Sequence, residues 1–578
     1  MAMNVEPRKS GSTVSPSPES TGLDFYASDP SLKGLLEIYV SAAEREHMAQ
    51  HFGRLGRLVG GRLDALAREA DRMPPRLEPR TRLGEDRQTI VKAPAYRAME
   101  RIAFGELALA ALSHRPALGW SQPLSAASKY ALTYLFAQSE FGLLCPVNMT
   151  DSLTRTIRRY ADHELVARYL PGLLATTGDG QLQGAMFMTE RLAGSDVGAT
   201  TTRAERCGDH WRLFGEKWFC SNADADLALV LARPDGAPGG TAGLGLFLMP
   251  RLMPSGAPNR YRIVRLKDKL GTRAMASGEI SLEGAVAWLI GDVGAGFKQM
   301  AEMVNQSRLS NGVRSTGLMR RAVHEALTVA LGRRAFGQRL LDLALVRRQL
   351  IKMILAAEAA LSVAFYSADC LERADRGEAE AETLRRILTP LIKLRACRDA
   401  RKVAGDAMEM RGGNGYIEEW IEPRLLREAH LGSIWEGTSN IIALDVVRTA
   451  SKTAAHRLLQ ARLEAMIAAA PAELARPLSE RIGAAFALIE HAAAAADARV
   501  ARQAATGIYH ATAAALFVHE AQRLNDGTRW DLARLLLAHK LLPRDPLRAS
   551  AADDAAGDRV IAALVAARQF WAAPVPLD

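Results

Sequence analysis

A stretch of about 100 residues with β-type sequence divides this chain into helical parts. Between residues 184 and 290, short apolar runs such as DLALVLA, GLGLFLM and RYRIVRL alternate with turn-rich segments such as PDGAPGGTAG. Such runs predict the strands of a compact β domain. Before and after it, Leu, Ala, Arg and Glu recur every three to four residues, which predicts helices. The chain therefore reads α, β, α, and no internal repeat of fixed period is visible.

These sequence patterns predict five segments along the chain. We expect a disordered tail over 1–34, an N-terminal helical domain over 35–183, a β domain over 184–291, long helices over 292–450 and an extra helical domain over 451–578. In the last segment one helical stripe is predicted to be buried. Its members are Tyr509, Ala513, Phe517, Ala521 and Leu524.

Composition excludes several classes of protein. Of 578 residues, 48% are hydrophobic and 24% charged, an ordinary globular balance. No apolar run reaches the roughly 18 residues of a membrane helix, and MAMNVEPRKSGSTVSPSPES is not followed by the apolar stretch of a secretory signal. The five cysteines lie far apart without a CxxC pair, which argues against a metal site or a disulfide framework and favours a cytoplasmic location.

The net charge of +10 is spread along the chain and forms no strongly basic tail. Residues 451–578 carry 15 basic and 13 acidic side chains. A candidate DNA-binding face in this segment would use Arg499, Arg502, Arg523, Arg529, Arg534, Lys540, Arg544 and Arg548. A charge-mixed helical surface and a packing role between protomers are equally open.

Six short motifs could belong to a ligand site, but each by itself is weak evidence for one. The sequence MTERLAGSD contains a common Gly-Ser-Asp turn, and GEKWFCSN reads equally well as an edge strand with a core aromatic. RRAFG could offer a guanidinium to a phosphate, and RGGNGY a glycine turn that lets backbone approach a pyrophosphate. Neither is a GxGxxG after a strand, so a Rossmann site is not indicated. KLGTRAMAS and IWEGTSN complete the set.

In this order the six motifs resemble the acyl-CoA dehydrogenase superfamily of flavoproteins, over residues from about 40 to 450. KWF-x-S, LLCPVNMT, AMEMRGGNGY and the long C-terminal extension are similar to its AidB branch, the alkylation-response flavoproteins. The resemblance implies an α+β, mostly α fold with an N-terminal helical domain, a central β-barrel, a four-helix bundle and an extra helical domain. It also implies FAD, an acyl-CoA or carrier-protein thioester, no membrane, and a homotetramer or at least a dimer.

Carried over residue by residue, the resemblance implies two groups of FAD contacts. Met188 and Thr189 would meet the flavin ring, with Gly194 allowing close approach and Ser195 near the ring or the thioester. Phe219 would stack on the ring, and Ser221 would bond flavin N5. The second group would hold the pyrophosphate and adenine, usually across a subunit boundary. It comprises Arg333, Phe336, Gly412 and Gly413, with Thr438 and Asn440 in a further FAD-contacting turn.

Glu436, between Trp435 and Gly437, falls where the family keeps its catalytic base. Abstraction of a proton next to a thioester requires a carboxylate held close to that carbon. A solvated loop glutamate is the alternative. Three residues depart from the family pattern at positions related to ligand binding. Glu409 and Ala344 each stand where the family has Gln, and Asn305 replaces an acid.

Two functions compete at this stage. The first is FAD-dependent α,β-dehydrogenation of an acyl thioester with Glu436 as base. The second is an AidB-like, DNA-associated flavoprotein with little dehydrogenase turnover, in which the C-terminal domain contributes to binding double-stranded DNA.

Overall fold

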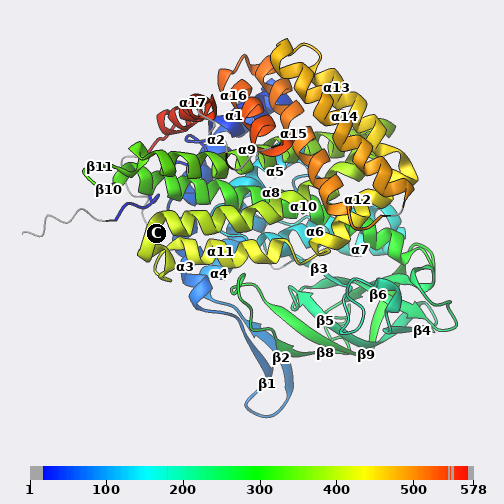
Figure 1. The fold of residues 1–578 in the computed structure, drawn as a ribbon. Helices are drawn as coiled ribbons and strands as arrows, with labels where there is room; N and C mark the ends of the chain where they lie inside the picture. The colour runs from blue at the N-terminus through cyan, green and yellow to red at the C-terminus, as the bar shows by residue number, and fades with distance from the viewer. Residues whose placement is uncertain (1–16, 179, 496, 544–546, 548–551, 571–578) are drawn as a thin grey trace, which may run out of the picture.

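The computed structural model describes residues 17–178, 180–495, 497–543, 547 and 552–570. A thick helical body forms one side of the molecule, and a barrel of strands lies against one of its faces (Figure 1). This arrangement confirms the predicted fold class, including the extra helices at the C-terminal end.

The N-terminal helical part has local signals at its helix starts. Helix α1 (Pro30–Tyr39) begins with proline, and the Asp29 carboxylate caps it by accepting from the Leu32 amide at 3.0 Å. Ser41 caps α2 (Ala42–Val59) in the same way. The remaining helices are α3 (Arg62–Arg72), α4 (Pro94–Glu100), α5 (Ala126–Ala137), α6 (Leu144–Tyr160) and α7 (His163–Leu173).

Residues 17–34 correct the predicted tail. Leu23 and Phe25 are fully buried, and Leu23 forms a β-bridge with Phe570 from the other end of the chain. Phe25 also packs edge-on against His324 of the bundle, with ring centroids 5.2 Å apart. The short apolar stretch LDFY has too few residues to show a period, but it gains enough contacts to be ordered. Residues 1–16 lie outside the described part of the chain.

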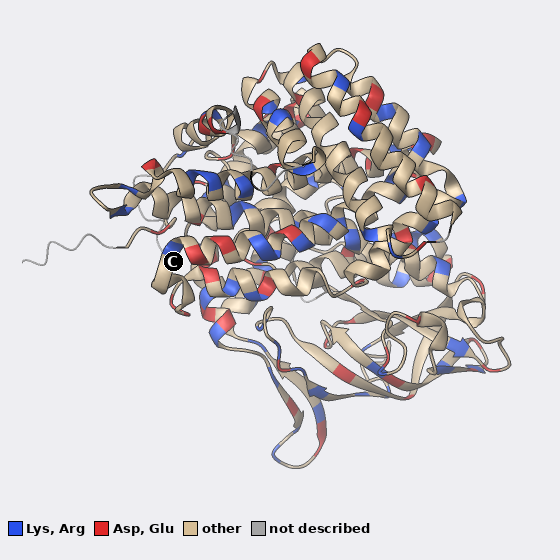
Figure 2. Cartoon of the chain, in the orientation of Figure 1, with Lys and Arg blue, Asp and Glu red and all other residues tan. Residues whose placement is uncertain are grey.

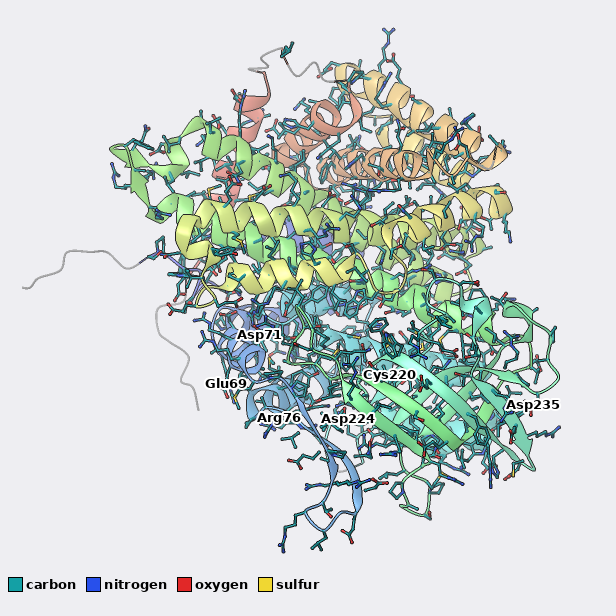
Figure 3. The ribbon with its side chains drawn as sticks, turned by 60° about the horizontal axis from the view of Figure 1, so that its bottom comes forward. Glu69, Asp71, Arg76, Cys220, Asp224 and Asp235 are labelled. Carbon is teal, nitrogen blue, oxygen red and sulfur yellow. The ribbon has the colours of Figure 1, made fainter. Side chains whose placement is uncertain are left out.

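A β-hairpin interrupts the helices of the N-terminal domain. Its strands β1 (Arg76–Arg80) and β2 (Asp86–Val91) pair antiparallel beyond α3, whose Asp71 lies near the point where the hairpin leaves the helical body (Figure 3). Gln88 ties the hairpin to the barrel, since its side chain accepts from the Ile263 amide at 2.9 Å. Tertiary contacts of this kind are invisible to a reading of local propensity.

The barrel contains strands β3 (Gly184–Phe187), β4 (Arg203–Cys207), β5 (His210–Ser221), β6 (Leu227–Pro234), β7 (Gly245–Pro250), β8 (Tyr261–Leu266) and β9 (Ser277–Ile290). The order β6-β4-β5-β9-β7 closes on itself through β6–β7 pairing, while β3 and β8 pair with β6 and β9. Strands β6 and β7 are buried almost throughout, as their continuous apolar runs predict.

Long helices fill the centre of the body: α8 (Gly296–Gly332), α9 (Ala344–Asp375) and α10 (Ala379–Arg411), followed by α11 (Ile421–Gly432) and α12 (Ser439–Thr453). Part of α9 is long and apolar enough to cross a membrane, but 89% of that window is buried inside the protein. Helix α9 therefore packs as a core helix.

The C-terminal domain contains α13 (Ala455–Ile467), α14 (Ala472–Ala494), α15 (Ala501–Leu524), α16 (Gly527–Leu536) and α17 (Ala552–Ala566). The predicted stripe on α15 is buried at Tyr509, Ala513, Phe517 and Ala521, and half-buried at Leu524. Figure 2 shows basic and acidic residues interspersed along these helices.

The structure corrects the candidate DNA face at Arg529. This side chain is buried, and its guanidinium pairs with Glu358 of α9 at 3.1 Å and with Glu520 of α15 at 3.3 Å. It therefore joins the C-terminal domain to the bundle and is not available to phosphates. Arg499 pairs with Asp497 at 2.9 Å and Arg534 with Asp531 at 3.6 Å, while Arg544 and Arg548 lie outside the described residues.

Candidate active site

The loop between α11 and α12 presents Glu436 in an unusual backbone conformation. Its φ is +57°, in the left-handed region that non-glycine residues rarely adopt, and Gly437 follows with φ +107°. Such a conformation costs of order 1 kcal/mol or more and persists only when its surroundings enforce it. The strain at this residue supports a functional role for Glu436.

Three side chains from two bundle helices enforce this conformation by binding carbonyl oxygens of the loop. Asn311 of α8 donates to the Gly432 carbonyl at 3.0 Å, and Arg308 of α8 donates to the Glu436 carbonyl, also at 3.0 Å. Lys393 of α10 donates to the carbonyl of Gly437. Because carbonyls beyond a helix end lack helical partners, these bonds satisfy them and fix the loop.

Arg308 is itself held in place by buried partners. Its Nη1 lies 2.9 Å from Asp445 of α12 and 3.2 Å from the Asn305 side-chain oxygen. Arg386 of α10 lies 3.1 Å from the same Asp445 carboxylate. Burial lowers the pKa of Arg308, with Arg386 acting in the same direction, whereas Asp445 and Glu436 raise it. Asn305, which replaces an acid of the family pattern, therefore supports the loop.

The Glu436 carboxylate makes one bond, from the Ser307 hydroxyl, and its second oxygen is buried without a partner among the described residues. The Cys145 thiol of α6 shares this environment. Burial raises its pKa to about 11; the charge of Glu436 acts in the same direction, whereas Arg314, Lys269 and the Ser221 hydroxyl lower it. Glu436 and the barrel residue Ser221 thus both influence Cys145.

A β-bulge on the barrel positions the aromatic and hydroxyl of GEKWFCSN. The pairing of β5 with β9 shifts register between Lys217 and Cys220, so that Phe219 leaves the regular ladder and is 61% exposed. Beyond it, Ser221 pairs with Ser277, and their hydroxyl oxygens lie 3.4 Å apart. Lys269 donates to that Ser277 hydroxyl at 3.2 Å.

A buried ion pair fixes the neighbouring segment that carries Met188 and Thr189. The Lys217 ammonium contacts Glu190 at 2.8 Å and the Leu231 carbonyl at 2.7 Å. Burial raises the pKa of Glu190, but Lys217 and hydrogen bonds from Thr202 and Thr201 outweigh it and lower that pKa to about 2. The Thr189 carbonyl accepts from the Trp218 amide at 2.9 Å, and exposed Gly194 and Ser195 follow in the next loop.

Arg333 and Gly412 are brought together at another part of the molecule. The Arg333 guanidinium donates to the Arg411 carbonyl at 2.7 Å, and Gly412 has φ +73°. Phe336, on the hairpin of β10 (Arg334–Ala335) and β11 (Gln338–Arg339), is 93% exposed. Gly413 is exposed beside Gly412, and Thr438 and Asn440 are exposed at the start of α12.

Arg333, Phe336 and the Gly412 turn do not meet the barrel residues within one chain, whereas Thr438 and Asn440 follow closely after Glu436. The β10–β11 hairpin projects from the end of the helical body remote from the barrel, as Figures 1 and 3 both show. The donors of each group nevertheless fit parts of FAD: an exposed ring and hydroxyls suit a flavin, and a glycine turn with a guanidinium suits a pyrophosphate. Of the residues that depart from the family pattern, Glu409 is exposed and Ala344 is the first residue of α9.

Sequence reasoning missed most of the residues that shape the site. Three of them, Lys393, Ser307 and Asn311, lie in helices whose other residues have the apolar pattern of a bundle core. The fourth, Lys217, lies in a segment that reads as an ordinary strand with alternating apolar and polar residues. A usable signal was the presence of polar side chains at positions predicted to face a core, because buried polar groups need partners.

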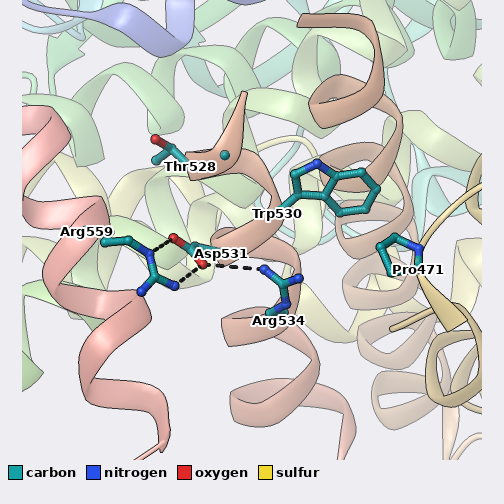
Figure 4. Close-up of a pocket in the computed structure, with 7 residues that line it drawn as sticks. Pro471, Thr528, Trp530, Asp531, Arg534 and Arg559 are labelled. Atoms are coloured by element: carbon teal, nitrogen blue, oxygen red, sulfur yellow. Dashed lines mark hydrogen bonds and ion pairs between the residues drawn. The ribbon is translucent and has the colours of Figure 1, made fainter. Parts of the chain in front are cut away.

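Two hollows in the structure lie away from Glu436. One, of about 480 Å³, is in the C-terminal domain and is lined by Pro471, Trp530 and Asp531, whose carboxylate is bound by Arg559 and Arg534 (Figure 4). The other, of about 210 Å³, lies between α3 and α11. Their linings carry none of the predicted catalytic or cofactor-binding residues.

Comparison with known proteins shows which families this chain resembles over most of its length. Residues 294–452 match the acyl-CoA dehydrogenase C-terminal domain, 185–285 the middle domain, and 16–180 the N-terminal domain of the adaptive response protein AidB. Acyl-CoA dehydrogenase family member 11 of Caenorhabditis elegans is 32% identical over 74% of this chain and 70% of its own length. The crystal structure of C. elegans ACDH-11 in complex with C11-CoA superposes with TM-score 0.86 and 28% identity, covering 96% and 98% of the two chains.

The chain therefore belongs to the acyl-CoA dehydrogenase family of enzymes. Within that family it falls in the AidB branch. AidB of Escherichia coli K12 is 39% identical over 55% of this chain and 59% of its own length.

Proposed function

We propose that the protein is an FAD-dependent dehydrogenase that introduces a double bond into an acyl thioester, with Glu436 as the base. The observation that carries this proposal is the left-handed loop, held by Arg308 and Lys393, which presents a half-buried glutamate with one carboxylate oxygen that has no partner among the described residues. A carboxylate held in this way suits removal of a proton from the carbon next to the thioester.

The chain's own residues have separate tasks in this reaction. Glu436 takes the α proton, Ser307 orients its carboxylate, and Phe219 and Ser221 receive the flavin ring and its edge. FAD bound there would accept the hydride from the β carbon, so that the two C–H bonds broken leave a carbon–carbon double bond. The C11-CoA complex of the C. elegans relative supports an acyl-CoA as substrate class.

Completion of the FAD site would require a second subunit. The β10–β11 hairpin, which follows Arg333 and carries Phe336, lies at the end of the helical body remote from the barrel (Figure 1), and Arg333 bonds the Arg411 carbonyl next to the Gly412–Gly413 turn. Large apolar side chains in this part of the protein are exposed: Phe336, Leu345 and Tyr416. Exposed apolar surface of this kind is typical of an interface, and we propose a homotetramer, or at least a dimer, that shares the cofactor.

An anaerobic titration of the FAD-loaded protein with a panel of acyl-CoAs tests the proposal. Loss of the oxidised flavin absorbance with one class of acyl-CoA is expected, and Glu436→Gln should abolish it while FAD stays bound. Retention of the oxidised spectrum with every thioester would contradict the proposal.

Binding of double-stranded DNA is a second candidate function, favoured by a basic cluster on α10 and α15. Burial lowers the pKa of Arg398, and the neighbouring charges of Arg502, Arg395 and Arg401 lower it further. Fluorescence anisotropy with a duplex should show binding that weakens with salt, and replacing Arg398 and Arg502 by Ala should reduce the salt dependence by about two charges. Arg476→Ala, in an exposed pair with Glu480, is the matched control. Absence of binding at low salt would remove this candidate.

A further inference from the structure

The four largest fully buried side chains of the described residues are all arginines. Three of them have carboxylate partners, as buried charges require. These pairs are Arg320 with Asp29 (3.3 Å) and Glu358 (2.6 Å), Arg411 with Glu325 (2.8 Å) and Glu422, and Arg529 with Glu358 (3.1 Å) and Glu520 (3.3 Å).

Arg314 is the exception. Its Nε donates to the Ser310 carbonyl at 3.3 Å, but Nη1 and Nη2 are buried and have no hydrogen-bond partner among the described residues. The guanidinium carbon lies 4.8 Å from the Trp435 ring centre and 5.3 Å from that of Phe141. Aromatic faces offset part of the cost of burying a cation, but they leave its hydrogen-bond donors unused.

This unpaired cation lies beside the candidate base. Trp435 immediately precedes Glu436 and stacks on Phe141, with ring centres 5.9 Å apart. Both Arg314 and Glu436 act on the Cys145 thiol. The Glu436 carboxylate also has one oxygen without a partner, yet no ion pair joins it to Arg314. Two charged groups, each with atoms that lack a partner among the described residues, therefore lie on either side of Trp435 in sequence and packing.

We infer that Arg314 binds the terminal carboxylate of a short acyl chain, so that the substrate is the CoA thioester of a dicarboxylic acid. This inference rests on the proposed dehydrogenase function. A neutral alkyl end would leave the cation uncompensated, whereas a carboxylate matches the planar fork of a guanidinium in both charge and geometry. The chain must be short because Arg314 contacts the ring of the residue next to the base.

The test compares glutaryl-CoA with valeryl-CoA, which has the same length and no terminal charge. Binding to the full-length, FAD-loaded protein is followed by the change in flavin absorbance. The wild type should bind glutaryl-CoA at least ten times more tightly. Arg314→Met should weaken glutaryl-CoA about 100-fold and valeryl-CoA less than threefold, because it removes the partner of a buried charge. Arg314→Lys should restore part of the difference.

Thermal unfolding supplies an independent readout. Since Arg314 lacks a counter-ion, Arg314→Met should leave the melting temperature of the ligand-free protein unchanged or raise it. Arg320→Met removes the buried cation that pairs with Asp29 and one of the two that pair with Glu358, and should lower the melting temperature by about 5 °C or more. A loss of stability in Arg314→Met as large as that in Arg320→Met would show that Arg314 is structural and would overturn the inference.

The outcomes separate this inference from the proposed function. Flavin reduction by valeryl-CoA but not by glutaryl-CoA, or equal effects of Arg314→Met on both ligands, would overturn the inference and leave the dehydrogenase standing. Failure of all thioesters to perturb or reduce bound FAD would overturn the proposed function and the inference together.

Discussion

The Nε atom of Arg308 lies 3.0 Å from the carbonyl oxygen of Glu436, although the two residues are 128 positions apart in the chain. This bond runs to the backbone of the candidate base and not to its carboxylate. Arg308 therefore sets the direction in which the left-handed loop presents the Glu436 side chain, while its charge is balanced by Asp445.

Arg308→Met is expected to slow flavin reduction by acyl-CoA about 100-fold with FAD still bound, since small displacements of a reacting group cost that much. Arg386→Met is the matched control, because it removes the other partner of Asp445 and leaves the bond to Glu436 intact. Stopped-flow measurement of flavin bleaching distinguishes the two. Equal slowing in both variants would mean that the ion pair with Asp445, and not the bond to the loop, determines the rate of flavin reduction.

Arg333→Ala should weaken FAD binding about 30-fold, because a charge-assisted hydrogen bond to a phosphate is lost. Arg334→Ala serves as the control, since this neighbouring, exposed arginine contacts the Gly337 carbonyl of its own hairpin. Titration of the apoprotein with FAD, followed by flavin fluorescence, measures both. Unchanged affinity in Arg333→Ala would place the pyrophosphate elsewhere.

Lys217→Met should reduce the free energy of unfolding by about 3–5 kcal/mol, because Glu190 would remain buried without its cation. The exposed pair of Arg203 with Glu205 provides the comparison, and Arg203→Met should cost at most about 1 kcal/mol. Urea unfolding gives both values. Similar losses in the two variants would contradict the assigned role of the buried pair.

The pH dependence of stability should also reveal Glu190. Its pKa is about 2 in the folded protein, below the ordinary value of about 4.3. The stabilisation is therefore complete above about pH 4.3 and is lost as the pH falls toward 2. Glu190→Gln should flatten the unfolding free energy over this acidic range. An unchanged acid slope would show that other carboxylates account for it.

Arg529→Met should destabilise the whole chain by about 3–5 kcal/mol, since Glu358 and Glu520 would lose their shared cation. The C-terminal domain and the bundle should still unfold in a single transition. Exposed Arg502 of α15 is the control, and Arg502→Met should change stability by less than about 0.5 kcal/mol. Calorimetry that shows a separate, early transition of the C-terminal helices would contradict the coupling.

Local sequence determined much of what this protein is. The strands of 184–290 and the long helices on either side followed from apolar patterns, because those patterns record which face of an element is buried. The motif order around Phe219, Arg333 and Glu436 identified the family, since a cofactor site requires particular residue types at particular points of the chain.

Only the tertiary structure decided how these residues act. The clamps on the Glu436 loop come from Arg308, Asn311 and Lys393, on helices distant in sequence. Neither the burial of Arg529 nor the unpaired state of Arg314 could be read from composition. The physical reason is that local patterns encode backbone preference and burial, whereas the partner of a charge is set by long-range packing.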